Sequence, residues 1–319
     1  MNPIGGYFEL ELPLCCEYHG KAIALNTGRN SLEYILRVRG YKRVYLPYYS
    51  CEVLLEPFKK LGAEYTFYHI NECLELEEDV ELKDGEALLY INYFGLKQDY
   101  VETLAAEYGQ QLIVDNTQAF YAHPIEGIDT FYSSRKYFGV ADGAYLYCNK
   151  SLEMELEQDQ SWERMGYLLK RIDLSPEAAY ADFRARSADL HNNPIRTMSP
   201  LTHRIMASID YQQAAHRRRD NYRLLDEALR GKNRILLPLT EDYVPMVYPY
   251  LEYQGDALRK HFIDHQVYCA RYWPNVFDWC NATDNEHLLA KNLVCIPVDQ
   301  RYGENDMQEI LDLIARFQK

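Results

Sequence analysis

Short apolar runs alternate with amphipathic stretches between residues 22 and 148. The runs span five to eight residues and are nearly continuous, which is typical of strands buried on both faces of a largely parallel sheet. They predict seven strands: Ala22–Asn26, Arg43–Pro47, Ala63–Ile70, Ala87–Phe94, Gln111–Asp115, Asp129–Ser134 and Gly143–Cys148. The stretches between them favour helices at Ser31–Arg39, Cys51–Leu61 and Tyr100–Tyr108. This alternation predicts a doubly wound α/β domain.

The second half of the chain has a different pattern. Residues 151–190 have a helical composition with a break at Ser175–Pro176, and a long helix is predicted from Ser199–Pro200 to Gly231. Beyond it we expect a strand within Tyr243–Tyr253, a helix at Asp256–Gln266, a further segment at Asn292–Val298 and a last helix from Asn305. The pattern therefore predicts a large α/β domain over residues 1–205, then a linking helix and a small α+β domain over residues 206–319.

Composition and charge narrow the functional classes. The 319 residues are 47% apolar and 26% charged, as in an ordinary globular protein. Lys and Arg total 34 against 48 Asp and Glu, a net charge of −14 that argues against binding to nucleic acid. No stretch approaches the roughly 20 apolar residues of a membrane helix, so no membrane association is expected. The basic cluster at His216–Arg219 is expected to be a solvated helix face, and the acidic segment Asn71–Glu86 a solvated loop.

The first twenty residues have no basic region of the kind that opens a signal peptide, so a cytoplasmic location is expected. The eight cysteines show no C-x-x-C spacing and predict reduced, mostly buried thiols. His261, His265 and Cys269 could share one helix face. A zinc site needs four ligands, or three and a water, and no fourth is evident, so a metal site is the weaker alternative there.

Three segments with chemically useful side chains fall at predicted strand ends. Asp115 ends one strand, Lys136 follows the next strand, and Gly28 lies in the turn between the first strand and the first helix. Ligands of open α/β sheets bind at the carboxyl ends of strands, so a carboxylate, a lysine and a glycine-containing turn are expected to converge there. The sequence has neither a P-loop nor a G-x-G-x-x-G motif, so nucleotide binding of those kinds is not indicated.

In this order the motifs resemble the DegT/StrS family of pyridoxal-phosphate-dependent nucleotide-sugar aminotransferases. The matching segments are Thr27–Leu32, Leu46–Ser50, Asn92–Gly95, Val114–Ala119, Ser133–Lys136, Asp142–Gly143, Ser199–Gly231 and Cys295–Val298. The similarity extends over nearly the whole chain. It implies the aspartate aminotransferase-like fold, in which a seven-stranded, mostly parallel sheet domain carries a smaller C-terminal α+β domain.

The resemblance also implies roles for individual residues. Lys136 would form a Schiff base with the aldehyde of pyridoxal 5'-phosphate and later move the substrate proton. Asp115 would pair with the pyridine nitrogen, and Gln118 would lie beside the phenolic oxygen of the cofactor.

The phosphate of the cofactor would be held at the start of the first helix. The backbone N–H groups of Gly28 and Arg29 would bind it together with the hydroxyl of Ser133. Asn193, with Asn192 as the adjacent alternative, is the candidate for the asparagine that family members extend to the phosphate of a partner subunit. The resemblance therefore implies a homodimer.

One departure from the family concerns the ring that stacks on the cofactor. Cys51 occupies the place of this aromatic residue, and Tyr48 or Tyr49 could substitute for it. The resulting hypothesis is an aminotransferase that moves an amino group, with glutamate as the expected donor, to a keto group of a nucleotide-linked sugar in polysaccharide biosynthesis. Two alternatives stay open: a sugar dehydratase that uses the same cofactor, and a non-catalytic relative that acts as a regulator or scaffold. Dehydratases among the relatives carry histidine at the position of Lys136, which favours the aminotransferase.

Overall fold

A seven-stranded sheet forms the first half of the molecule in the computed structural model, which describes residues 4–319. Its strands are β1 (Ile23–Leu25), β2 (Arg43–Pro47), β3 (Glu64–Tyr68), β4 (Glu86–Ile91), β5 (Leu112–Asn116), β6 (Asp129–Ser133) and β7 (Ala144–Tyr147). They lie in the order β1-β7-β6-β5-β4-β2-β3. Strands β2 to β6 pair in parallel, while β7 runs antiparallel to both of its neighbours. The prediction of seven strands in a mostly parallel sheet is confirmed.

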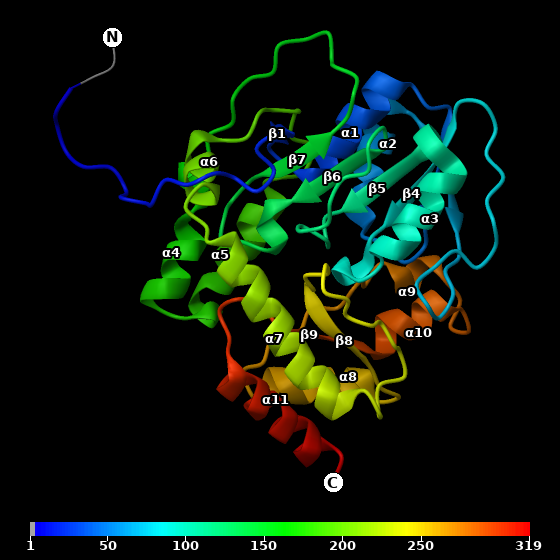
Figure 1. Cartoon of the computed structure of the whole chain (residues 1–319). Coiled ribbons are helices and arrows are strands. Elements are labelled where there is room, and N and C mark those ends of the chain that lie inside the picture. The colour runs from blue at the N-terminus through cyan, green and yellow to red at the C-terminus, as the bar shows by residue number, and fades with distance from the viewer. Residues whose placement is uncertain (1–3) are drawn as a thin grey trace.

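Helices flank this sheet (Figure 1). They are α1 (Gly28–Arg39), α2 (Leu55–Leu61) and α3 (Gln98–Tyr108), with short 3-10 turns η1 (Glu52–Leu54), η2 (Tyr93–Gly95), η3 (Gly109–Gln111) and η4 (Ser134–Lys136). Helix α1 begins where the side chain of Thr27 accepts a hydrogen bond from the backbone N–H of Asn30. It ends at Gly40, whose left-handed backbone terminates the helix.

The second half of the chain is mainly helical. Its elements are η5 (Trp162–Arg164), α4 (Gly166–Asp173), α5 (Pro176–Ala188), α6 (Pro200–Met206), α7 (Tyr211–Leu229), α8 (Gly255–Asp264), α9 (Val276–Trp279), α10 (Asn285–Asn292) and α11 (Glu304–Phe317), with strands β8 (Val247–Leu251) and β9 (Leu293–Pro297). Strands β8 and β9 form a separate antiparallel pair. Strands β8 and β9 together with α8 to α11 form a smaller unit that lies below the large sheet in Figure 1, and α7 leads into it.

The long helix predicted from Ser199 to Gly231 is in fact two helices. Helix α6 ends at Met206, and α7 begins only at Tyr211. Between them the carboxylate of Asp210 accepts a hydrogen bond of 2.9 Å from the backbone N–H of Gln213, so Asp210 caps a new helix. The predicted domain boundary after residue 205 falls in the last turn of α6, and this boundary stays a prediction.

Arg218 corrects the expectation that the basic cluster His216–Arg219 is a solvated face. Its side chain is fully buried, and its guanidinium donates hydrogen bonds to the carbonyls of Pro245 and Met246. The same guanidinium lies 4.4 Å from the centre of the Tyr137 ring. A buried arginine is stable only when its charge and donors are satisfied, and here backbone carbonyls and an aromatic ring supply the partners.

The cysteines also differ from the expectation. All eight are free thiols, but only Cys269 and Cys295 are buried, and the prediction of mostly buried thiols was therefore wrong. The exposed ones lie in the segment before β1 and in the acidic loop after β3, where little packing covers the chain. Within residues 4–319, no helix is both long and apolar enough to span a bilayer.

Candidate active site

The structure brings Lys136 to the carboxyl end of the sheet, as the sequence predicts. Strands β5 and β6 are parallel neighbours, with Asp115 opposite Phe131, so the segments that follow them emerge at the same edge. Lys136 lies in η4, directly after β6, and its amine donates a hydrogen bond of 3.0 Å to the hydroxyl of Thr117. Thr117 lies between Asp115 and Gln118 in sequence, and the lysine is close enough to Asp115 to feel its charge.

The amine of Lys136 is set up to lose its proton readily. Its side chain is accessible to solvent, yet protein surrounds the amine closely enough for desolvation to lower its pKa. The negative charge of Asp115 opposes this shift without reversing it. A neutral amine is the form that attacks a carbonyl carbon and accepts a proton, so this environment suits a nucleophile or a base.

Asp115 is a buried carboxylate with few partners. It is 4% exposed and accepts one hydrogen bond, of 2.8 Å, from the backbone N–H of Thr117. None of the ion pairs found among residues 4–319 involves Asp115. Burial raises its pKa, against the opposing effects of Lys136 and Thr117. A buried carboxylate of this kind is costly when ionised, and a cationic N–H group on a ligand would remove that cost.

Gln118 is fixed at one end and free at the other. Its side-chain oxygen accepts a hydrogen bond of 2.9 Å from the backbone N–H of Phe94, while its side-chain nitrogen is buried without a partner. Phe94 has a φ of +58°, in the left-handed region that residues other than glycine rarely adopt. Strained backbone tends to occur at functional sites. Here the N–H of the strained Phe94 holds the side-chain oxygen of Gln118 and so orients its unpaired side-chain nitrogen. The sequence motif Asn92–Gly95 did not reveal this strain.

The N-terminus of α1 packs against the same turn. A Cβ atom at Gly28 would lie 3.2 Å from the Thr117 methyl group, which is tighter than most side chains tolerate. The backbone N–H groups of Gly28 and Arg29 have no acceptor in residues 4–319. Two free donors at the positive end of a helix form a natural site for an anionic group.

The other residues predicted to hold phosphate are less clearly placed. The guanidinium of Arg29 forms an ion pair of 2.7 Å with Glu56 and is therefore directed toward α2. The side-chain amide of Asn193 donates to the carbonyl of Asp189, at 2.9 Å in its own chain. Ser133 is half-buried at the end of β6, and a role for its hydroxyl stays a prediction. The role of Asn193 across a dimer likewise stays a prediction.

Asp142 belongs to a segment that resembles the family, yet it has a structural role here. It is fully buried and accepts hydrogen bonds from the backbone N–H of Ser199 at 3.0 Å and from the hydroxyl of the same residue at 2.9 Å. The hydroxyl of Thr202 is a third donor. Asp142 therefore anchors the start of α6 to the end of the loop before β7.

Neither tyrosine near Cys51 is an evident substitute for the expected stacking ring. Tyr48 stacks on Phe67, with ring centres 4.7 Å apart, and Tyr49 is buried edge-on to Trp273. Cys51 itself is half-buried beside η1.

Tyr272 was not predicted from the sequence. This half-buried residue of the C-terminal region has its ring 6.1 Å from that of Phe94. Burial raises the pKa of its hydroxyl, with smaller contributions from Cys295, Tyr137 and Cys51. Tyr272 thus brings the smaller unit close to the strained Phe94, and no sequence pattern indicated this long-range contact.

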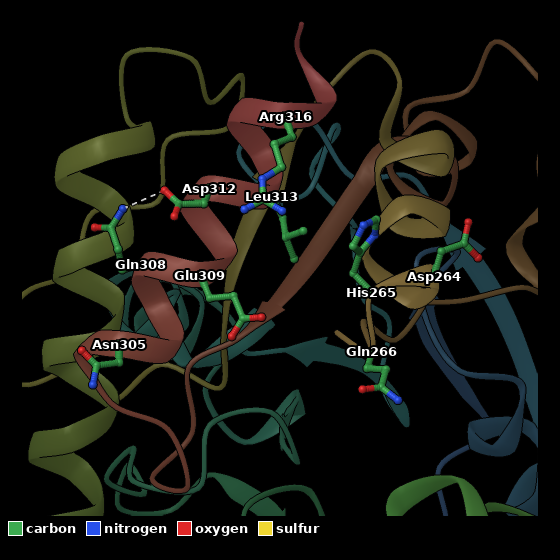
Figure 2. A pocket seen from close by; sticks show the side chains of 9 residues that line it. All are labelled: Asp264, His265, Gln266, Asn305, Gln308, Glu309, Asp312, Leu313 and Arg316. Carbon is green, nitrogen blue, oxygen red and sulfur yellow. Dashed lines mark hydrogen bonds between the residues drawn. The ribbon is translucent and has the colours of Figure 1, made fainter.

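A hollow of about 530 Å³ lies elsewhere, between α8 and α11 (Figure 2). Its lining is mostly polar and includes Asp264, His265 and Arg316, but none of the predicted site residues. No cluster of three or more His, Cys, Asp or Glu side chains suited to a metal ion occurs in the described part of the chain.

Comparisons with known proteins agree with this geometry at the level of fold. No protein-family model and no curated protein sequence match the chain. Among solved structures, the apo-form of the putative sugar aminotransferase Spr1654 from Streptococcus pneumoniae has a TM-score of 0.64 at 13% identity, covering 92% of this chain and 84% of that one. The aminotransferase TlmJ from Streptoalloteichus hindustanus has a TM-score of 0.63 at 18% identity, with the same coverage.

A DegT DnrJ EryC1 StrS aminotransferase from Brucella abortus has a TM-score of 0.61 at 15% identity, covering 93% of this chain and 85% of that one. This chain therefore has the fold of these aminotransferases. The fold that the resemblance implied, an aspartate aminotransferase-like sheet domain with a smaller C-terminal unit, is confirmed.

Proposed function

We propose that this protein is a pyridoxal-phosphate-dependent aminotransferase of the DegT/StrS family. It moves an amino group, with glutamate as the donor, to a keto group of a nucleotide-linked sugar, in the cytoplasmic synthesis of a polysaccharide. One observation carries the proposal. At the carboxyl ends of β5 and β6, the amine of Lys136 is bonded to Thr117, which lies between Asp115 and Gln118 in sequence, and the buried side-chain nitrogen of Gln118 has no acceptor.

These unused groups fit the cofactor one by one. Pyridoxal 5'-phosphate has a ring nitrogen that can be protonated, a phenolic oxygen, an aldehyde and a phosphate. Asp115 lacks an ionic partner, and the buried nitrogen of Gln118 lacks an acceptor. The amine of Lys136 has a lowered pKa, and the N–H groups at the start of α1 are free. The donor set therefore matches the cofactor in type and in number.

The residues of the chain would divide the work as follows. When bound, the cofactor supplies an electron sink for the substrate carbon that loses its proton. Lys136 would hold the cofactor covalently and, once displaced, would carry the proton at its amine nitrogen. The hydroxyl of Thr117 orients that nitrogen, with which it shares a hydrogen bond of 3.0 Å. Asp115 would keep the ring nitrogen protonated, and Gln118 would donate to the phenolic oxygen.

We also propose that the active form is a homodimer in which Asn193 reaches the phosphate site of the partner. The segment around Asn193 lies beside α1, since Asn30 donates a hydrogen bond of 2.8 Å to the carbonyl of Pro194. Lys60 donates at 2.7 Å to the carbonyl of Asn193. These contacts hold the segment of Asn193 in place within its own chain, and the reach toward the partner is what the family resemblance implies. Asn193→Ala should weaken cofactor binding in a titration of the dimer, and unchanged binding would refute the role.

Activity can be tested in two halves. Purified protein is mixed with pyridoxal 5'-phosphate and then with glutamate, while the visible absorption band of the lysine-bound cofactor is recorded. We expect the band to form, to fade on addition of glutamate with release of 2-oxoglutarate, and to return when a keto nucleotide-sugar is added and converted to the aminosugar. A band that glutamate leaves unchanged would contradict the proposed donor. Formation of a deoxysugar in place of an aminosugar would point to the dehydratase.

A further inference from the structure

The segment before β1 forms an arm with the pattern of a half-buried strand. In this N-terminal arm, defined as residues 4–14, apolar residues alternate with acidic ones from Phe8 through Glu9, Leu10 and Glu11 to Leu12. Such alternation places all apolar side chains on one face. Yet Phe8 is 91% exposed and Leu10 is 62% exposed. The arm pairs with no strand of residues 4–319 and extends away from the body of the protein (Figure 1).

The base of the arm is firmly held at α6. The backbone N–H of Cys15 donates at 2.8 Å to the carbonyl of Ala207, and the carboxylate of Glu17 lies 2.6 Å from the ring nitrogen of His203. Farther out, Glu9 approaches Arg204 to 3.6 Å. These contacts fix where the arm leaves the molecule, so its exposed apolar face is presented in a defined direction.

A second uncovered apolar surface lies on the neighbouring helical hairpin of α4 and α5. The hairpin patch consists of five exposed apolar residues: Leu169, Ile172, Leu174, Tyr180 and Phe183. Ile172 is 81% exposed. The segment that leads into α4 is joined to α6 by a hydrogen bond of 2.7 Å between the hydroxyls of Ser161 and Ser199. Arm and hairpin thus border the same helix and lie on one side of the molecule (Figure 1).

We propose that the N-terminal arm of one copy packs on the hairpin patch of a second copy of this chain. The inference rests on the homodimer proposed above and assigns it an interface. A two-fold axis presents the same surface on both subunits, so an arm and a patch on one side allow two identical contacts. Uncovered apolar groups that gather in this way mark interaction surfaces, whereas single exposed residues do not.

Charges support a chain-to-chain contact. Glu11 in the arm has no ion-pair partner in residues 4–319, and neither has Arg184 on α5. Arg184 follows Tyr180 by four residues and so shares its helix face. Other charges of the hairpin are used locally, since Lys170 pairs with Asp182 and Arg186 pairs with Asp189. Arg171, Asp173 and Glu177, the last of which accepts a hydrogen bond from the hydroxyl of Tyr268, are the further charged groups that an incoming arm would meet.

The test compares dimer dissociation constants of full-length holoprotein variants by analytical ultracentrifugation. Leu10→Glu and Ile172→Glu should each raise the dissociation constant about tenfold or more, because both bury a charge in the apolar contact. Leu236→Glu is the matched control, since Leu236 is 66% exposed but lies outside both surfaces, and it should change nothing. A dimer unaffected by both interface variants, or a monomeric wild type, would overturn the proposal.

Cross-linking separates contact between copies from an arm folded back on its own chain. A benzoylphenylalanine placed at position 8 is photoactivated in a mixture of tagged and untagged copies. Links to the α4–α5 hairpin of the other copy are expected, and links confined to one copy would overturn the proposal. A wild type that dimerises as predicted but binds no pyridoxal 5'-phosphate would instead refute the proposed function alone, so the two failures are distinguishable.

Discussion

Two buried aspartates, Asp115 at the end of β5 and Asp142 just before β7, have opposite surroundings. Asp142 accepts three hydrogen bonds, from the backbone and hydroxyl of Ser199 and from the hydroxyl of Thr202. Asp115 accepts one, from the backbone of Thr117, and has no ion pair within the described chain. Both lie in segments that resemble the same family. The three-dimensional partners distinguish a carboxylate with three hydrogen-bond donors from one with a single donor.

The difference has an energetic meaning. A buried polar group that is fully bonded contributes to stability, whereas one left unpaired costs about 1–3 kcal/mol, or more when it is charged. Proteins retain such a cost where function requires it. The side-chain nitrogen of Gln118 and the N–H groups at the start of α1 are unpaired, and Asp115 has one hydrogen bond and no ion pair, whereas Asp142 has three hydrogen bonds. Substitutions at the two aspartates should therefore act on different properties.

The largest effect is expected at Lys136. Lys136→Ala should abolish the visible band of the bound cofactor completely. Within residues 4–319, no other lysine amine is hydrogen-bonded to Thr117. Lys97→Ala is the matched control, since the amine of Lys97 is also bonded within the protein but to Glu75 and not to Thr117. The absorption spectrum measures both. A band of full intensity in Lys136→Ala would exclude this lysine as the attachment site.

Asp115→Asn should cause a large loss of activity with a folded protein. The amide keeps the size of the side chain but removes the charge that would face the ring nitrogen. Removal of one partner from a buried charge pair costs about 2–5 kcal/mol, which corresponds to a rate roughly 30 to 4,000 times lower. The rate of the glutamate half-reaction measures this loss. Activity close to that of the wild type would contradict the role of Asp115.

Asp142→Asn should have the converse effect. The amide cannot accept hydrogen bonds on both atoms, so at least one of the three donors around it loses its acceptor. We expect the free energy of unfolding to fall by about 1–3 kcal/mol. Chemical denaturation of the cofactor-free protein measures it, and Asp115→Asn in the same assay should lose nothing or gain stability. Equal destabilisation by both variants would remove the distinction between the two aspartates.

The smallest expected effect is a dependence of stability on pH. Burial raises the pKa of Asp115 above its unfolded value, so the native state binds this proton more tightly than the unfolded state does. The unfavourable contribution of Asp115 to the free energy of unfolding therefore grows as the pH rises from the pKa of the unfolded state, about 3.9, through the raised pKa of the folded state. The advantage of cofactor-free Asp115→Asn over the wild type should increase over this window. An advantage that shrinks as the pH rises would reverse the assigned sign.

Much of the fold was predictable because it depends on local patterns. Continuous apolar runs gave the positions of all seven strands of the large sheet, and strand order then brought Asp115 and Lys136 to one edge. Features that depend on distant partners were not predictable. The burial of Arg218 depends on carbonyls 27 and 28 residues away, and the division of the long helix depends on the cap formed by Asp210.

The same limit applies to the candidate site. The order of residues predicted Lys136, Asp115 and Gln118 as a set, since their types and spacing carry the resemblance. The left-handed backbone of Phe94 and the approach of Tyr272 were not predicted, because both follow from tertiary contacts. The resemblance implied a cofactor role for Asp115 and none for Asp142, but it did not predict the hydrogen-bond partners of either residue.

The most direct test of the central claim is to locate the cofactor on the chain. The holoprotein is reduced with borohydride, which makes the cofactor–lysine bond permanent, and is digested and mapped by mass spectrometry. We predict a single modified peptide that contains Lys136. In Lys136→Ala, no peptide should be modified to a comparable extent. Modification of a different lysine, or of none, would contradict the assignment of this site as the one that binds pyridoxal 5'-phosphate.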